Sequence, residues 1–234
     1  KKKYSKDIKI PMKILAIQNR MGIGDMVIFI PFIEAIAKKY DTPISILVKE
    51  NSKASQFLGN SKHIEKIIIL DRDNKNGRHD GIIGSIKLIN DLRKFKFEKV
   101  FIFNSSLRFN LICKFSGVNK IYQYPLFNKK NQHIIQTAKD FLEKELNLKI
   151  ESNPNLELEE SLIQNAKKKY QINNKQKNIL FGIGGSGPTK RIPAIKFINF
   201  MKMALEIYDC KFFLATGIKE EEQVILNEIM QSEY

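Results

Sequence analysis

The chain has 234 residues, of which 43% are hydrophobic, and it carries a formal net charge of +15. This length and apolar share are typical of a soluble globular protein with one large or two modest domains. The two cysteines, Cys113 and Cys210, lie far apart and outside any C-x-x-C motif, which argues against a zinc site or a disulfide framework. The positive charge suits nucleic acid, anionic lipid or a phosphorylated substrate, but lysines spread along the whole chain equally fit an ordinary solvated surface.

The N-terminal stretch "KKKYSKDIKIPMK" is basic, but only four apolar residues follow it before Gln18, which is too short for a signal-peptide core. The most apolar later run, "MVIFIPFIEAIA", is shorter than the ~20 residues that span a bilayer, and it contains Glu34. We therefore expect a cytoplasmic protein whose contact with a membrane, if any, is peripheral.

In the first half of the chain, apolar runs typical of strands alternate with helical patterns. The strands are expected near residues 14 to 17, 44 to 48, 67 to 70 and 100 to 103, and the helices near 28 to 40, 53 to 58 and 83 to 95. The strands are continuously apolar, which indicates a sheet covered on both faces. The pattern predicts an α/β fold with a doubly wound parallel sheet.

A short run "KIYQY" and a helix from 133 to about 146 close the first domain. A polar segment containing Pro154 then leads through another helix to a new strand, "KNILFGIGG", and the β-α rhythm restarts. We expect an N-terminal extension at 1 to 11, a first domain at 12 to 152, a linker and helix at 153 to 174, and the start of a second domain at 175 to 234. Roughly 60 residues are few beside the ~100 to 150 common in domains, so the second domain is expected to be incomplete.

The first strand runs into the turn "NRMGIGDMVIFI", where Gly22 and Gly24 precede Asp25. A dinucleotide-binding turn would carry a third glycine at position 27, but Val27 stands there. A helix N-terminus attracts anions, and Asp25 can take the anion position itself. Two interpretations remain open: Asp25 is an N-cap, or it performs chemistry at the carboxyl edge of the sheet, where ligands of such folds bind.

A second glycine-rich loop, "GIGGSGPTKR" at 182 to 191, lies between a strand and a helix. It offers the hydroxyls of Ser186 and Thr189 and the charge of Lys190 to a diphosphate. Pro188 removes a backbone donor, so the loop is not a Walker P-loop. The alternative is an exposed loop whose cations are merely solvated.

The three histidines show no metal-ligand spacing. We expect His63 and His79 at the surface and His133 as the cap of a helix. There is no G-x-S-x-G motif, and Cys113 lies in an apolar helical run without a neighbouring histidine, so nucleophilic serine or cysteine catalysis has no support.

Taken together, the order of these segments resembles glycosyltransferase family 9, the heptosyltransferases of lipopolysaccharide core assembly. The resemblance covers nearly the whole chain from Met12. It rests on "MKILAIQNRMGIGDMVIFIPFIEAIAKKY", "GVNKIYQY", "NQHIIQTAKDFL" and "ILFGIGGSGPTKRIPAIKF". It implies a GT-B-type fold of two Rossmann-like domains and an inverting, metal-independent transferase without a cofactor. Such an enzyme moves a sugar, heptose in the commonest case, from a nucleotide diphosphate to a lipid-linked saccharide at the inner membrane.

The resemblance also implies roles for individual residues. Asp25 matches the catalytic carboxylate, which takes a proton from the acceptor hydroxyl, and the helix N-terminus favours its ionised form. Lys190 matches the cation that steadies the donor phosphates. The full donor-phosphate set is Gly185, Ser186, Thr189 and Lys190, and the acceptor-side loop is Arg20, Gly22 and Gly24.

The chain departs from the family in two places. Arg20, Met21 and Gly22 stand where the family has small hydroxyl residues, and the later D-T-G-x-x-H type segment is absent before Tyr234. Two alternatives therefore stay open beside the transferase. One is a non-catalytic binding module of the same fold, and the other is a basic nucleic-acid-binding protein, although no nucleic-acid partner is expected.

Overall fold

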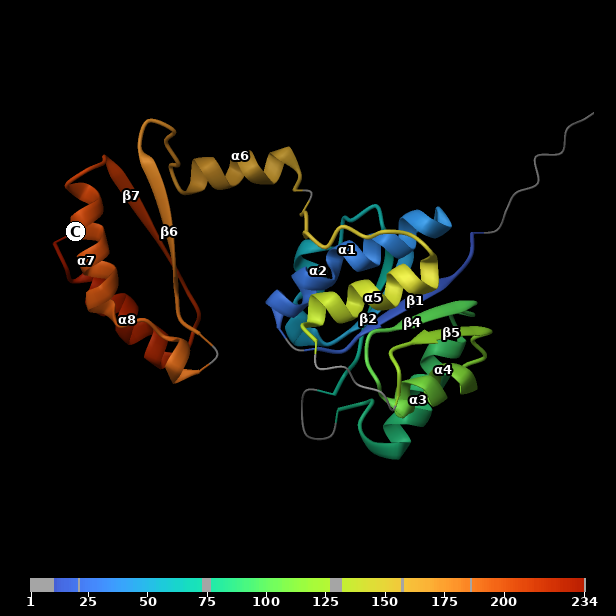
Figure 1. The fold of residues 1–234 in the computed structure, drawn as a ribbon. Helices are drawn as coiled ribbons and strands as arrows, with labels where there is room; N and C mark the ends of the chain where they lie inside the picture. Colours follow the sequence, from blue (N-terminus) through green and yellow to red (C-terminus); the bar gives the residue numbers. More distant parts are fainter. Residues whose placement is uncertain are drawn as a thin grey trace, which may run out of the picture. The chain divides into compact units, whose positions relative to one another are not determined.

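The computed structural model describes residues 11–20, 22–72, 77–126, 132–156, 158–185 and 187–233. The chain divides into two compact units, unit 1 from Lys1 to Glu157 and unit 2 from Leu158 to Tyr234. Each unit is an α/β structure with parallel strands, and each is considered by itself (Figure 1).

Unit 1 is built on a five-stranded sheet in the order β3-β2-β1-β4-β5. Every neighbouring pair of strands is parallel. The strands are β1 (Ile14–Gln18), β2 (Ile44–Val48), β3 (Ile64–Ile69), β4 (Lys99–Ile102) and β5 (Lys120–Gln123). The predicted parallel sheet is confirmed, and the third strand begins three residues earlier than the position 67 expected from its apolar run.

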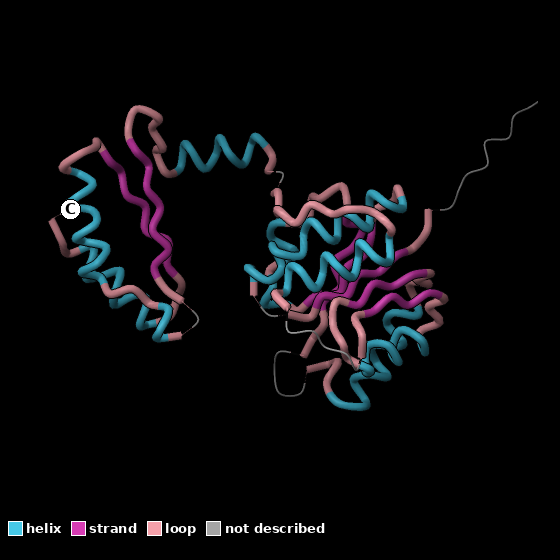
Figure 2. The backbone as a smooth tube through the Cα atoms, viewed as in Figure 1, coloured by secondary structure: helices cyan, strands magenta, loops and turns pink. Residues whose placement is uncertain are grey.

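Helices cover both faces of this sheet (Figure 2). The helices of unit 1 in the described ranges are α1 (Ile23–Tyr40), α2 (Ala54–Phe57), α3 (Gly81–Arg93), α4 (Leu107–Phe115) and α5 (Ile134–Leu146), with a 3-10 turn η1 (Glu50–Ser52). None of the helices in the described part of the chain is both long and apolar enough to cross a membrane.

The continuous apolar strands follow from this arrangement, because successive side chains of a strand point to opposite faces. In β1, Ile14 and Ala16 pack in the core formed with α1 and α5, whereas Leu15 and Ile17 pack in the core formed with α3 and α4. Both faces are thus apolar and buried, so a strict alternation of apolar and polar residues is absent.

Unit 2 has a two-stranded parallel sheet in which β6 (Lys177–Ile183) pairs with β7 (Cys210–Thr216). Its helices in the described ranges are α6 (Glu160–Lys169), α7 (Ala194–Leu205) and α8 (Glu220–Met230). Phe181 stacks on Phe212 at 5.5 Å between ring centres and packs in a small core with α7 and α8. The neighbouring Leu180 is 69% exposed. One face of this sheet is therefore covered, and unit 2 is the smaller of the two units.

Two expectations about histidines have different outcomes. His133 is the N-cap of α5, and its imidazole accepts a hydrogen bond from the Ile135 amide, so the predicted cap is confirmed. The expectation that His79 lies at the surface is wrong, because His79 is only 5% exposed. Its Nδ1 accepts a hydrogen bond from the Asp71 amide at 3.1 Å, so Nε2 carries the proton that it donates to Asp91 at 3.3 Å.

Candidate active-site loops of the two units

The turn after β1 brings Asp25 to the carboxyl edge of the unit 1 sheet. Gly22 is the N-cap of α1, with a φ of 98° that favours glycine, and its carbonyl accepts the first helical hydrogen bond from Met26. Asp25 is consequently the third residue of the helix, and the interpretation of Asp25 as the N-cap is wrong. Gly22 has no side chain with which to cap the first turn.

The Asp25 carboxylate is partly exposed and makes no hydrogen bond or ion pair with any residue in the described ranges. It lies in the first turn of an 18-residue helix, where the backbone amides and the helix dipole stabilise a negative charge. A carboxylate that is neither a cap nor half of an ion pair is available to a ligand.

Arg20 and Gly24 flank Asp25 and leave the space around the turn open. The Arg20 backbone amide donates to Oε1 of Gln18 at 3.1 Å, while the Arg20 side chain is exposed. Gly24 is also exposed, and a methyl group built on it would meet no atom within 4 Å. Gly24 and Asp25 therefore lie in an accessible first turn of α1, which follows the N-cap Gly22.

A cavity of about 660 Å³ opens at the same edge of unit 1. The segments that follow β1, β4 and β5 supply one side of it, and α5 supplies the other. Its lining comprises Asn19, Arg20, Phe103, Asn104, Ser105, Gln123, Tyr124, Pro125, Gln132, Ile134, Thr137, Asp140, Phe141, Lys144 and Glu145. Amides, aromatic rings and a few charged groups are all present, which is the composition of a site for a polar organic ligand.

A hydrogen-bond network fixes the amides of this cavity. The Asn104 amide donates to Asn19 at 3.1 Å, the Gln123 amide donates to the Asn104 carbonyl at 3.0 Å, and Asn110 donates to Gln123 at 2.8 Å. The network joins the ends of three strands that are neighbours in the sheet but distant in the sequence. Each side chain is thereby held in one orientation before any ligand binds.

Tyr124 is the most unusual group of the cavity lining. Its hydroxyl is buried and has no hydrogen-bond partner among the described residues. Burial raises the pKa of Tyr124, against the smaller opposing effect of the Arg20 cation, so the phenol stays protonated as a donor. Its ring packs edge-on against Phe141 at 5.1 Å. A buried donor without a partner in the wall of a cavity favours a ligand that accepts hydrogen bonds.

In unit 2, the loop after β6 turns sharply around Glu222 of α8. The Gly185 amide donates to Oε1 of Glu222 at 3.4 Å, and the Glu222 side chain is buried. Gly184 has a φ of 128°, and a methyl group built on Gly185 would lie 2.9 Å from Cβ of Lys190. Both glycines are needed for this close path of the backbone. The loop therefore brings Gly185 beside Lys190.

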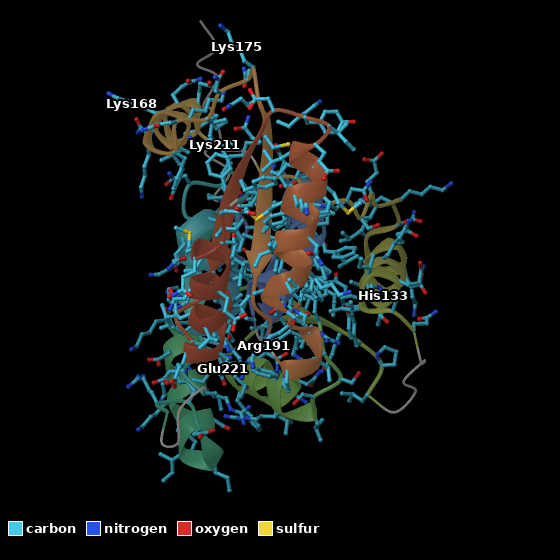
Figure 3. All side chains as sticks on the ribbon, turned by 90° about the vertical axis from the view of Figure 1, so that its left-hand side faces the viewer. His133, Lys168, Lys175, Arg191, Lys211 and Glu221 are labelled. Carbon is cyan, nitrogen blue, oxygen red and sulfur yellow. The ribbon has the colours of Figure 1, made fainter. Side chains whose placement is uncertain are left out.

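Thr189 and Lys190 lie in a 3-10 turn η2 (Pro188–Lys190), where a loop was expected. Both residues are exposed, and the Lys190 amide donates to the Gly187 carbonyl at 3.0 Å. Ser186, the remaining member of the predicted phosphate set, lies outside the described residues. The next residue, Arg191, lies 3.9 Å from Glu221 and has a buried Nε without a partner in the described ranges (Figure 3).

Several of these residues received no role from the sequence. Asn104 and Tyr124 follow strands and Gln123 is the last residue of β5, but polar residues at strand ends are common, and no local pattern shows that these three meet. Glu222 is one of three consecutive glutamates at the start of a helix, so nothing in the sequence distinguishes it as the buried one. In the described ranges, no three His, Cys, Asp or Glu side chains gather as a metal site would require.

The architecture of the two units is that of the GT-B glycosyltransferases, as predicted. Solved structures with this fold match nearly the whole chain. A glycosyl transferase family 9 protein from Veillonella parvula matches 95% of this chain and 67% of its own, with a TM-score of 0.72 and 17% identity. The E. coli ADP-heptose lps heptosyltransferase II matches 94% of this chain and 68% of its own, with a TM-score of 0.65 and 18% identity.

The E. coli heptosyltransferase WaaC with ADP matches 94% of this chain and 72% of its own, with a TM-score of 0.63 and 12% identity. No family model matches the sequence, and no curated protein matches it. At these identities the likeness establishes the fold.

Proposed function

We propose that this chain is a glycosyltransferase of cell-surface glycan synthesis, in which Asp25 is the general base. The single observation that carries the proposal is the Asp25 carboxylate in the first turn of α1, which has no partner among the described residues and lies at the same edge of the sheet as a polar cavity. Two of the structural neighbours, an ADP-heptose lps heptosyltransferase and a heptosyltransferase with ADP, support a nucleotide-sugar donor. Heptose is therefore the first sugar to test.

In this mechanism the acceptor saccharide binds to unit 1. Asp25 takes the proton from an acceptor hydroxyl as its oxygen attacks the anomeric carbon of the donor sugar. The new bond joins that oxygen to the anomeric carbon, and the bond between the anomeric carbon and the diphosphate oxygen breaks. Attack from the face opposite the leaving group inverts the anomeric centre. The amides of Asn104 and Gln123 and the ring of Tyr124 suit the hydroxyls and apolar face of a saccharide.

The donor binds to unit 2 in this proposal. Lys190 and the hydroxyl of Thr189 contact the diphosphate, and Ser186 and the Gly185 segment complete the set. Negative charge accumulates on the leaving nucleoside diphosphate as the sugar departs, so a cation held there lowers the barrier. The acceptor is lipid-linked in this proposal, and the enzyme acts at the cytoplasmic face of the inner membrane without a metal or cofactor.

Asp25→Asn tests the general base, with Glu34→Gln in the same helix as the matched control, because Glu34 forms an ion pair with Lys38 and does not line the cavity. Transfer is measured with ADP-, UDP- and GDP-sugars as donors. We expect Asp25→Asn to lower the rate ~10²- to 10⁴-fold, while Glu34→Gln leaves it unchanged. The helix-dipole contribution of Asp25 to stability is only ~0.3 to 1 kcal/mol, so unfolding cannot explain such a loss. Full transfer by Asp25→Asn would reject the mechanism.

The alternative is a binding module of the same fold that binds its ligand without catalysing sugar transfer. A rise in unfolding temperature with one nucleoside diphosphate, abolished by Lys190→Ala but accompanied by no transfer, would favour that alternative. If the chain shows no transfer and no nucleoside diphosphate shifts its unfolding temperature, the donor site is rejected. Salt-sensitive binding of an oligonucleotide at physiological salt would instead favour the nucleic-acid-binding alternative.

A further inference from the structure

Two neighbouring helices of unit 1 expose a row of large apolar side chains. We define the α3–α4 face by its exposed apolar members, which are Ile82, Ile83, Ile86, Leu107, Leu111 and Phe115. Ile82 is 82% exposed, Ile83 71% and Phe115 60%. Scattered exposed apolar residues are ordinary, but several on two packed helices mark an interaction surface.

The two helices form one continuous surface because hydrogen bonds join them along their length. Arg108 of α4 donates to the hydroxyl of Ser85 in α3 at 2.9 Å, and Arg93 of α3 donates to the Phe115 carbonyl at 2.9 Å. Figure 1 shows α3 and α4 on the same side of the sheet. The buried residues of α3, Leu88 and Leu92 among them, face the core, so the three exposed isoleucines of the face take the outer side of the helix.

The charge of the two helices indicates what covers this face. They carry four basic residues, Lys87, Arg93, Arg108 and Lys114, and one carboxylate, Asp91. Asp91 is already bonded to Arg78, His79 and Lys94. Lys87 and Lys114 are exposed and have no ion-pair partner among the described residues. Exposed isoleucines bordered by unpaired lysines match the pattern of a surface that lies on an anionic bilayer.

We propose that the α3–α4 face docks on an anionic lipid surface, with its apolar side chains in the interface and Lys87 and Lys114 on the headgroups. The N-terminal ends of α1, α3 and α4 all follow parallel strands and therefore share the carboxyl edge of the sheet. Docking through α3 and α4 would hold this edge, and Asp25 with it, close to the membrane. Only this last consequence rests on the proposed function, because it needs a lipid-linked acceptor.

The test is sedimentation of the full chain with vesicles of phosphatidylcholine and phosphatidylglycerol, compared with vesicles of pure phosphatidylcholine. We expect binding to the anionic vesicles that weakens with added salt. Lys87→Gln with Lys114→Gln should weaken binding by at least about tenfold, since each basic residue near such a surface contributes about fivefold. Lys167→Gln with Lys168→Gln in α6 is the matched control, because it removes the same charge elsewhere and should have a much smaller effect.

A second pair of variants tests the apolar contribution. Ile82→Gln with Ile86→Gln should weaken binding at least about tenfold, and glutamine keeps the helix stable. Ile195→Gln with Met203→Gln in α7 replaces two apolar residues of unit 2 that are also more than half exposed, and it should leave binding unchanged. Circular dichroism verifies that every variant is folded.

Three outcomes would overturn the proposal. The first is equal binding to neutral and anionic vesicles, and the second is an equal loss of binding in the α3–α4 variants and their controls. The third is a change in oligomeric state of the isoleucine variant without any change in vesicle binding, which would make the face an interface between copies. Vesicle binding needs no donor or transfer, so a failure here is distinct from a failure of the glycosyltransferase proposal.

Discussion

Gly84 of α3 is the position where one added methyl group has the most readily calculated consequence. An alanine Cβ at this buried position would lie 2.7 Å from the His79 Cα, whereas ordinary contact begins at 3.4 Å. The obstructing atoms belong to the His79 backbone, so no side-chain rotation can move them away. Gly84→Ala therefore requires the His79 backbone to move, and the hydrogen bonds of His79 to Asp71 and Asp91 are strained with it.

The magnitude follows from three terms. Overpacking costs ~1 to 3 kcal/mol, and weakening two hydrogen bonds costs ~1 kcal/mol each. The higher helix propensity of alanine offsets ~1 kcal/mol of this cost. We expect Gly84→Ala to destabilise unit 1 by about 2 to 4 kcal/mol, which lowers its unfolding temperature by roughly 5 to 15 °C.

The control is Gly24→Ala in α1, where the new methyl group meets no atom within 4 Å. That variant should be as stable as the wild type, or more stable by up to ~1 kcal/mol. Thermal unfolding of the full chain is followed by circular dichroism and by the reactivity of the buried Cys113 thiol, which reports unit 1 specifically. Equal or greater stability of Gly84→Ala would refute the argument from the His79 contact.

Two further predictions concern titratable groups. Burial alone would raise the pKa of Asp91, but hydrogen bonds from Arg78, His79 and Lys94 outweigh it and lower that pKa. The stability that this carboxylate contributes is therefore complete above its unfolded-state pKa of ~3.9 and is lost as the pH falls through its lower folded-state pKa. Urea unfolding at a series of pH values should show this loss in the wild type and not in Asp91→Asn. Burial raises the pKa of Cys113 to about 12, so a thiol reagent at about pH 8 should label Cys210 first and Cys113 only on unfolding.

Each of these predictions has a clear contrary result. A difference between wild type and Asp91→Asn that stays constant from about pH 6 down to about pH 2 would mean that the carboxylate is not held ionised by its partners. Mass spectrometry that finds both cysteines labelled at the same rate in the folded chain would mean that the core around α4 opens readily.

The local features of the fold were predictable because short-range patterns determine them. A continuous apolar run next to a helical pattern predicts a buried strand followed by a helix, and the structure has these elements in the expected order. The turn at Gly22 was predictable for the same reason, since its positive φ favours glycine. The N-cap was left open between Asp25 as a cap and Asp25 as a functional residue, because aspartate and glycine are both favourable at an N-cap, and the structure selects Gly22.

The cavity could not be predicted, because its residues come from segments far apart in the sequence. Asn19, Asn104 and Tyr124 meet only because the sheet places β1, β4 and β5 side by side. Polar residues after single strands carry no information on which strands are neighbours. His79 illustrates the same limit, since its burial depends on how α3 packs rather than on the residues around it.

The sequence by itself determined the α/β class, the parallel strands and the two glycine-rich turns, because propensity and periodicity act over a few residues. Only the tertiary structure decided that Asp25 has no partner among the described residues, that Tyr124 lines a cavity and that Ile82, Ile83 and Ile86 of α3 face outward. These properties depend on which surfaces of distant elements meet. They are also the properties from which a site is built, so the sequence indicated where chemistry is performed and the packing determined which groups are available for it.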